Sequence, residues 1–247
     1  MADTETAYQW AGEGSTTLSK DLPKEIRMGF VRKVYALLSI QLLATVVIAA
    51  PIAMHSIAWV QGHAWVPVMA VGLYIAVTCG MMCAPGVMRT FPANYIVLSI
   101  ITLALSIMVG FISATYTWQS VLLAAALTTA VVLSLTLYAW TTDTDFTGFG
   151  IYLVMACFTF FIFGVGIMIL GMFGVHFKFL TIAYDALGVL LFCGYLIYDT
   201  QLLIGENGGH KVEFSIDDYC MAAVQLYLDI INLFLLILEM VGERRGN

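Results

Sequence analysis

The stretches YDALGVLLFCGYLIYDTQLLIG (residues 184–205) and DDYCMAAVQLYLDIINLFLLIL (residues 217–238) decide the fold class of this chain. Each contains an apolar run of the kind that crosses a membrane, and each run carries an aspartate, Asp199 or Asp229. A carboxylate on a spanning helix costs about 2.5–3.5 kcal/mol to insert, so such residues usually face a bundle interior, a partner group or a water-filled path. The sequence therefore predicts a membrane protein with a shared proton or cation site.

The composition also indicates a membrane-embedded chain. Of the 247 residues, 61% are hydrophobic and only 11% are charged. Apolar runs of about 18 residues or more match a hydrocarbon core about 30 Å thick. Seven such runs follow residue 33, at Val34–Met54, Trp65–Cys83, Asn94–Ala114, Gln119–Trp140, Ile151–Phe173, Phe177–Thr200 and Tyr219–Val241. We expect an all-α integral membrane protein with seven transmembrane helices in one domain, residues 34–247, after a polar and disordered tail, residues 1–33.

The basic residues predict which side of the membrane the tail occupies. Seven of the ten lie in the tail or in loops on its side, and the other three are Lys178, Arg244 and Arg245. The positive-inside rule then favours a cytoplasmic N-terminus. Seven spans place Arg244 and Arg245 on the opposite side, whereas six spans with a re-entrant last segment would return them to the cytoplasm. We expect seven spans.

Four stretches together carry a family resemblance. They are IRMGFVRKVYALLSIQLLAT (26–45), FPANYIVLSIITLALSIMVG (91–110) and the two stretches quoted above, in which YDTQ and LYLDIINLF stand at the expected separation. The chain resembles the transmembrane Bax inhibitor motif family, Lifeguard branch. The resemblance implies two inverted three-helix units around a central seventh helix, a calcium leak from intracellular stores, and suppression of cell death.

The resemblance also implies that Asp199 and Asp229 form a paired, pH-sensing site. The physics of the pair agrees, because two carboxylates close together in a medium of low dielectric cannot both ionise cheaply and so share a proton. A calcium ion would replace that proton at a weak, transient site, since calcium prefers about 6–8 oxygen ligands. The structural alternative is that Asp199 ends its helix in the interface and that Asp229 bonds a nearby hydroxyl, that of Tyr198, Thr200 or Tyr227.

Two further charged residues are candidates for the pathway or its gating. Arg89 matches a basic position in a family loop and would pair with an aspartate in a closed state, or else it fixes topology at the interface. Asp185 departs from the family pattern. It precedes Asp199 by fourteen positions, which places it within about 40° of the same helix face and about 21 Å along the axis. Asp185 would line the opposite mouth of one path, or cap the helix near the interface.

The expected function is therefore a pH-sensitive calcium leak channel, with calcium as the transported ion and no cofactor. We expect no enzymatic activity and no nucleic-acid partner. An intramembrane aspartyl protease is the enzymatic alternative, but Asp229 lacks the glycine-flanked pattern of such enzymes. The other alternative is a non-transporting scaffold that acts through cell-death regulators or calcium-channel proteins. The resemblance implies the endoplasmic reticulum or Golgi membrane as the location.

Overall fold

The structure, a computed structural model, describes residues 24–175, 177–205 and 214–245. Within these ranges the chain is helical, and its only β-type pairing is an isolated bridge between Tyr116 and Arg244. The long helices are α2 (Lys24–Ala53), α4 (Trp65–Cys83), α5 (Ala93–Ser113), α6 (Trp118–Thr141), α7 (Gly150–Met172), α8 (Lys178–Ile204) and α9 (Tyr219–Val241). The connections contain α3 (Ile57–Gly62) and the single turns η1 (Pro85–Arg89), η2 (Thr147–Phe149) and η4 (Ile216–Asp218).

Seven helices in the described part of the chain are long and apolar enough to cross a membrane, which confirms the predicted fold class. Their ends agree closely with the apolar runs, except at α2 and α8. Helix α2 begins at Lys24, so the predicted boundary between tail and membrane domain at residue 33 falls inside a helix. Helix α8 continues four residues past the predicted end, to Ile204. The prediction of disorder for residues 1–23 lies outside the described residues.

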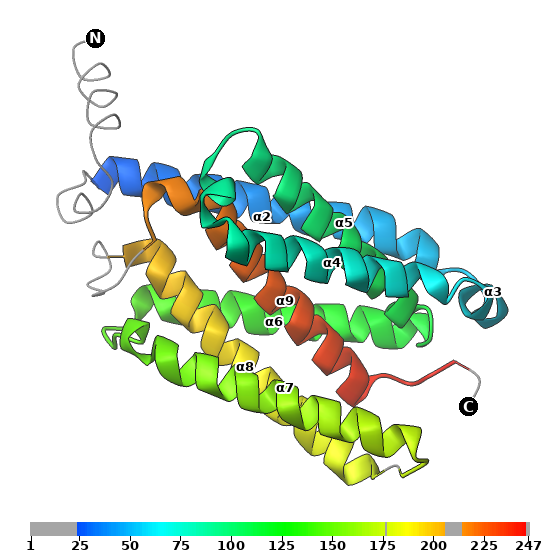
Figure 1. The fold of residues 1–247 in the computed structure, drawn as a ribbon. Helices are drawn as coiled ribbons and strands as arrows, with labels where there is room; N and C mark the ends of the chain where they lie inside the picture. The colour runs from blue at the N-terminus through cyan, green and yellow to red at the C-terminus, as the bar shows by residue number, and fades with distance from the viewer. Residues whose placement is uncertain (1–23, 176, 206–213, 246–247) are drawn as a thin grey trace.

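Helix α9 lies at the centre of the bundle. It contacts α2, α5, α6 and α8, and Figure 1 shows it passing between these helices. In the most apolar 18-residue window of α9, 61% of the residues are buried, against none in the corresponding window of α7. Because α7 packs chiefly on α8, most of its apolar surface is left to face lipid. The prediction of a central seventh helix is therefore confirmed.

The other six long helices fall into two sets with the same contact pattern. Helix α5 contacts both α2 and α4, and α8 contacts both α6 and α7. The third helix of each set in chain order, α5 in the first and α8 in the second, also packs on α9. This pattern agrees with two three-helix units, while the inverted relation between them stays a prediction.

Candidate functional site

Asp199 and Asp229 meet inside the bundle, where α8 packs against α9. Their side chains are 3% and 5% exposed, and their carboxyl groups lie within hydrogen-bonding reach of each other. Among the described residues, Oδ2 of Asp229 has no hydrogen-bond partner. Two buried carboxyl groups in contact cannot both carry a full charge at low cost, so this geometry requires a shared proton or a bound cation.

The sequence analysis offered an alternative in which Asp229 bonds a nearby hydroxyl group. In the structure, the three candidate hydroxyl groups have other neighbours. The hydroxyl of Tyr227 is 2.7 Å from Oγ1 of Thr45 on α2. The hydroxyl of Tyr198 lies against Gly150 at the start of α7. Oγ1 of Thr200 is buried and lies toward the hydroxyl of Tyr35 on α2. The partner that the structure gives Asp229 is therefore Asp199.

Arg27 holds the end of α8, five residues beyond Asp199. Its guanidinium donates to the carbonyl oxygens of Leu202 and Leu203 at 2.7 and 3.0 Å. It also donates to the carbonyl of Phe214, which precedes α9, at 2.6 Å. Arg27 is only 2% exposed, so the start of α2 fixes the helix end that positions Asp199. This role explains why α2 begins before its apolar run.

Gln201 ties the connection between α6 and α7 to the same end of α8. Its Oε1 accepts from the backbone N–H of Phe146 at 2.7 Å, and its Nε2 donates to the carbonyl of Thr144 at 2.9 Å. Sequence reasoning missed both Arg27 and Gln201. The signal available in the sequence was an arginine and a glutamine at the borders of apolar runs, which is common at any membrane interface.

A second buried polar group lies on the other side of α9, toward α2 and α5. Thr45 bonds Tyr227 and accepts from Oγ of Ser106 at 3.1 Å. One turn away, Nε2 of Gln41 donates to Oγ1 of Thr102 at 3.0 Å. These side chains are all at least nine-tenths buried. Sequence reasoning missed this network, although Gln41 with Thr45 and Thr102 with Ser106 each show the four-residue spacing of one helix face.

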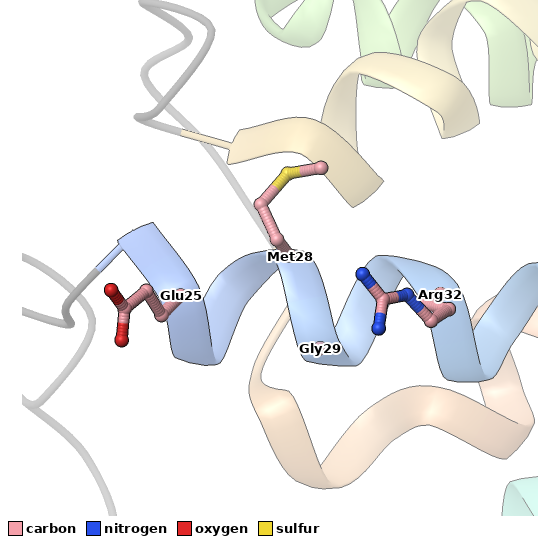
Figure 2. Close-up of a pocket in the computed structure, with 4 residues that line it drawn as sticks. All are labelled: Glu25, Met28, Gly29 and Arg32. Atoms are coloured by element: carbon pink, nitrogen blue, oxygen red, sulfur yellow. The ribbon is translucent and has the colours of Figure 1, made fainter.

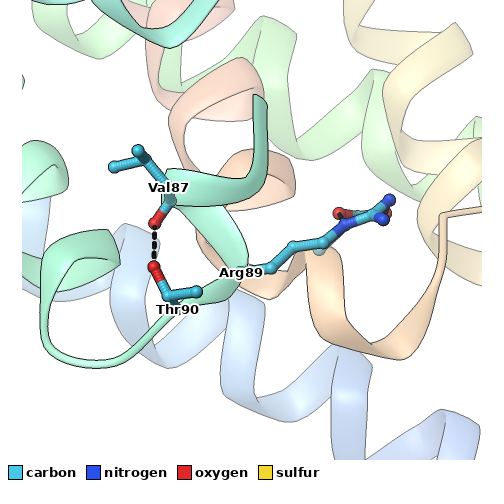
Figure 3. Close-up of polar contacts among 4 residues, drawn as sticks. Val87, Arg89 and Thr90 are labelled. Carbon is cyan, nitrogen blue, oxygen red and sulfur yellow. Dashed lines mark hydrogen bonds and ion pairs between the residues drawn. The ribbon is translucent and has the colours of Figure 1, made fainter. Parts of the chain in front are cut away.

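Arg89 does not contact the aspartate pair. In the turn η1 its Nε and Nη2 donate to the two carboxylate oxygens of Asp218 at 2.7 and 3.0 Å, and this hydrogen bonding raises the pKa of the guanidinium. Figure 3 shows the Arg89 side chain extending away from the turn. At the end of the turn, the hydroxyl of Thr90 donates a hydrogen bond to the carbonyl of Val87. The ion pair joins the α4–α5 connection to the start of α9. The partner of Arg89 is therefore Asp218, which the sequence analysis did not name, and a gating role for Arg89 stays a prediction.

Asp185 is also separate from the pair. It lies in the second turn of α8, fourteen residues before Asp199, and its side chain is 1% exposed. Fourteen residues of helix span about 21 Å, so the two acids cannot share a ligand. The α8 helix therefore carries one buried carboxyl group near each of its ends.

The described part of the chain holds no preformed metal site with three or more ligand side chains. Among the described residues, no group of three or more His, Cys, Asp or Glu side chains is placed to hold a metal ion. A pocket of about 460 Å³ lies at the start of α2, lined by Glu25, Met28, Gly29 and Arg32 (Figure 2). Its lining does not include either member of the aspartate pair.

Comparisons with known proteins identify the family. Residues 27–246 match the family model described as inhibitor of apoptosis-promoting Bax1. The chain is 33% identical to protein lifeguard 3 of Homo sapiens over 234 residues, which cover 90% of this chain and 70% of that protein. It is 37% identical to protein LIFEGUARD 4 of Arabidopsis thaliana over 246 residues, 96% of this chain and 93% of that protein. The chain is therefore a multi-pass membrane protein of the Bax1 inhibitor family, with Lifeguard proteins among its relatives.

Proposed function

We propose that this protein is a pH-sensitive calcium leak channel of an intracellular membrane, gated at Asp199 and Asp229, with suppression of cell death as its cellular role. The observation that carries the proposal is the meeting of the two buried carboxyl groups between α8 and α9, with an oxygen of Asp229 left without a partner among the described residues. Intramembrane acids of this kind mark ion and proton pathways.

A further oxygen atom on the Asp229 face of α9 supports cation binding. Oε1 of Gln225, one helical turn before Asp229, is buried without a partner among the described residues. Carboxylate and amide oxygens are the ligands that calcium prefers. So few protein ligands give a weak site, which suits an ion that must also leave.

Competition between the proton and the calcium ion supplies the pH sensitivity. The proton shared by the pair and a calcium ion would occupy the same oxygen atoms, so the proton concentration sets how often the site is free for the metal. Helix α9 is the natural moving element, because it carries Asp229 and contacts four of the other long helices. An N-terminus in the cytoplasm and a place in the endoplasmic reticulum or Golgi membrane belong to the same proposal.

A non-transporting scaffold is the second candidate. The almost fully exposed helix α7 favours it, because this apolar surface would accept another membrane protein as readily as lipid. The description of the family, inhibitor of apoptosis-promoting Bax1, agrees with a regulatory role. The Tyr-Leu-Asp context of Asp229 also lacks the glycine-flanked pattern of an intramembrane aspartyl protease.

Coupling between the two aspartates tests the gating proposal. Calcium efflux would be measured across a pH series in proteoliposomes that contain Asp199→Asn, Asp229→Asn or both substitutions. Each single variant should shift the pH profile, and the double variant should differ little from either, because groups that act as a unit are not additive. Asp218→Asn is the matched control, since this acid lies at the start of α9 but pairs with Arg89. Wild-type pH profiles in both single variants would refute gating by the pair.

A further inference from the structure

Asp185 is the buried acid that the proposed gate does not use. Both of its carboxylate oxygens are buried and lack a hydrogen-bond partner among the residues that the structure describes. An ionised carboxylate in such a place is several kcal/mol less stable than in water. This carboxyl group therefore needs a proton or a cation as its partner.

The groups around Asp185 come from several elements. The charged group that acts on it is the carboxylate of Glu239, near the end of α9. Tyr184 precedes it on α8 and stacks on Phe160 of α7, and Tyr116 lies in the connection between α5 and α6. Burial raises the pKa of the Tyr116 phenol, so this group stays protonated. The surroundings thus hold a second carboxylate and neutral donors.

Arg244 lies beside Tyr116 at this end of the bundle. Its guanidinium carbon lies 5.6 Å from the centre of the Tyr116 ring. No ion pair joins it to Asp185 or Glu239 within residues 24–175, 177–205 and 214–245. The charge on Glu239 therefore makes ionisation of Asp185 more costly without a compensating side chain.

The chain after α9 holds this end of the bundle in place. The backbone N–H of Thr117 donates to the carbonyl of Glu243 at 2.9 Å, and that of Arg245 donates to the carbonyl of Thr115 at 2.9 Å. Gly242 allows the approach, since a Cβ there would lie 2.6 Å from Cδ1 of Tyr116. In Figure 1 this is the red segment that leads from α9 toward the C-terminus. The position of Glu239 relative to Tyr116 is therefore fixed by backbone hydrogen bonds.

We propose that Asp185 and Glu239 form a second cation-binding station for calcium, at the end of the bundle opposite the Arg89–Asp218 ion pair. Glu239 is exposed, so it would receive the ion from water, whereas Asp185 is buried. Their helices pack closely here, since a Cβ at Gly188, one turn after Asp185, would lie 2.9 Å from Cδ1 of Leu236, one turn before Glu239. Two carboxylates attract a divalent cation and, with water, supply several of the oxygen ligands that calcium prefers. The role of this station in transport rests on the proposed calcium leak, because it would load ions about 21 Å along α8 from Asp199.

Terbium binding tests the station without measuring transport. Terbium replaces calcium at oxygen sites, and Tyr116 and Tyr184 are close enough to sensitise its luminescence. The titration would use the purified full chain with Asp229→Asn, which removes the central pair. We expect a saturable signal that calcium displaces, weakened at least about tenfold by Asp185→Asn and also weakened by Glu239→Gln. Glu243→Gln, an exposed acid at the same end, should leave the signal unchanged.

The outcomes separate the station from the proposed function. Equal terbium affinity with and without Asp185→Asn, or a signal that calcium does not displace, would overturn the station even if calcium efflux is present. Intact terbium binding in a protein that gives no calcium efflux would instead refute the leak, while the proposed binding site would stand. Because Glu239 is exposed, the Glu239→Gln protein should fold normally. If Asp185→Asn is poorly folded, the terbium affinity of Glu239→Gln decides the test.

Discussion

At the scale of single residues, buried charge decides how the helix ends are arranged. Arg27 carries a full positive charge in a site that is 2% exposed, and carbonyl oxygens at the end of α8 and before α9 receive its N–H groups. Hydrogen bonds from a charged donor to buried acceptors are among the strongest in proteins. The end of α8 that leads to the aspartate pair therefore depends on a residue of α2.

Replacement of Arg27 by leucine should destabilise the fold. The substitution removes the donors and leaves buried carbonyl oxygens unpaired, which should cost about 3 kcal/mol in the free energy of unfolding. Thermal unfolding in detergent micelles would measure the change. Arg32→Leu is the matched control, because Arg32 lies on the same helix but is exposed. Equal unfolding temperatures for the two variants would contradict the role assigned to Arg27.

At the scale of helices, close packing around α8 limits what the chain tolerates. Gly188 lies one turn after Asp185, and a Cβ there would lie 2.6 Å from Cζ of Phe160 on α7 and 2.9 Å from Cδ1 of Leu236 on α9. Phe160 cannot move freely, because its ring stacks on Tyr184 with centroids 4.1 Å apart. The glycine therefore lets α7 and α9 approach α8 from two sides, as small residues do in membrane bundles.

Gly188→Ala should thus lower the stability of the bundle, by about 1–2 kcal/mol, because the added methyl group overpacks the contact. In α4, a methyl group added at Gly72 would meet no packing neighbour within 4 Å. Gly72→Ala should be neutral or slightly stabilising, since alanine has the higher helix propensity. Unfolding midpoints in the same detergent compare the two variants. A Gly188→Ala protein as stable as Gly72→Ala would show that the contact is not tight.

The helices and the aspartate pair were predictable from the sequence to different degrees. Hydropathy alone located seven spans, because a hydrocarbon core demands long apolar runs. It placed the start of α2 ten residues late, since charged residues interrupt residues 24–33 and Arg27 is buried only because carbonyl oxygens of a distant helix accept its N–H groups. Asp218 was likewise not recognised as the partner of Arg89, because 129 residues separate them and either could have faced water.

At the scale of the whole molecule, the two ends of the bundle hold different charged groups. Arg89 and Asp218 form an ion pair at the start of α9, whereas Asp185 and Glu239 lie at the far ends of α8 and α9 without a counter-charge among the described residues. Asp199 and Asp229 lie between these ends, inside the bundle. The proposed cation path would follow these groups along α8 and α9.

The central claim is that this bundle conducts calcium. The most direct measurement is calcium efflux from liposomes that contain purified wild-type protein, followed across a pH series beside Asp229→Asn and protein-free liposomes. The proposed function predicts efflux above the lipid background in the wild type, with a pH profile that Asp229→Asn changes. Well-folded wild-type protein that gives no efflux above lipid at any pH would contradict it and favour the scaffold.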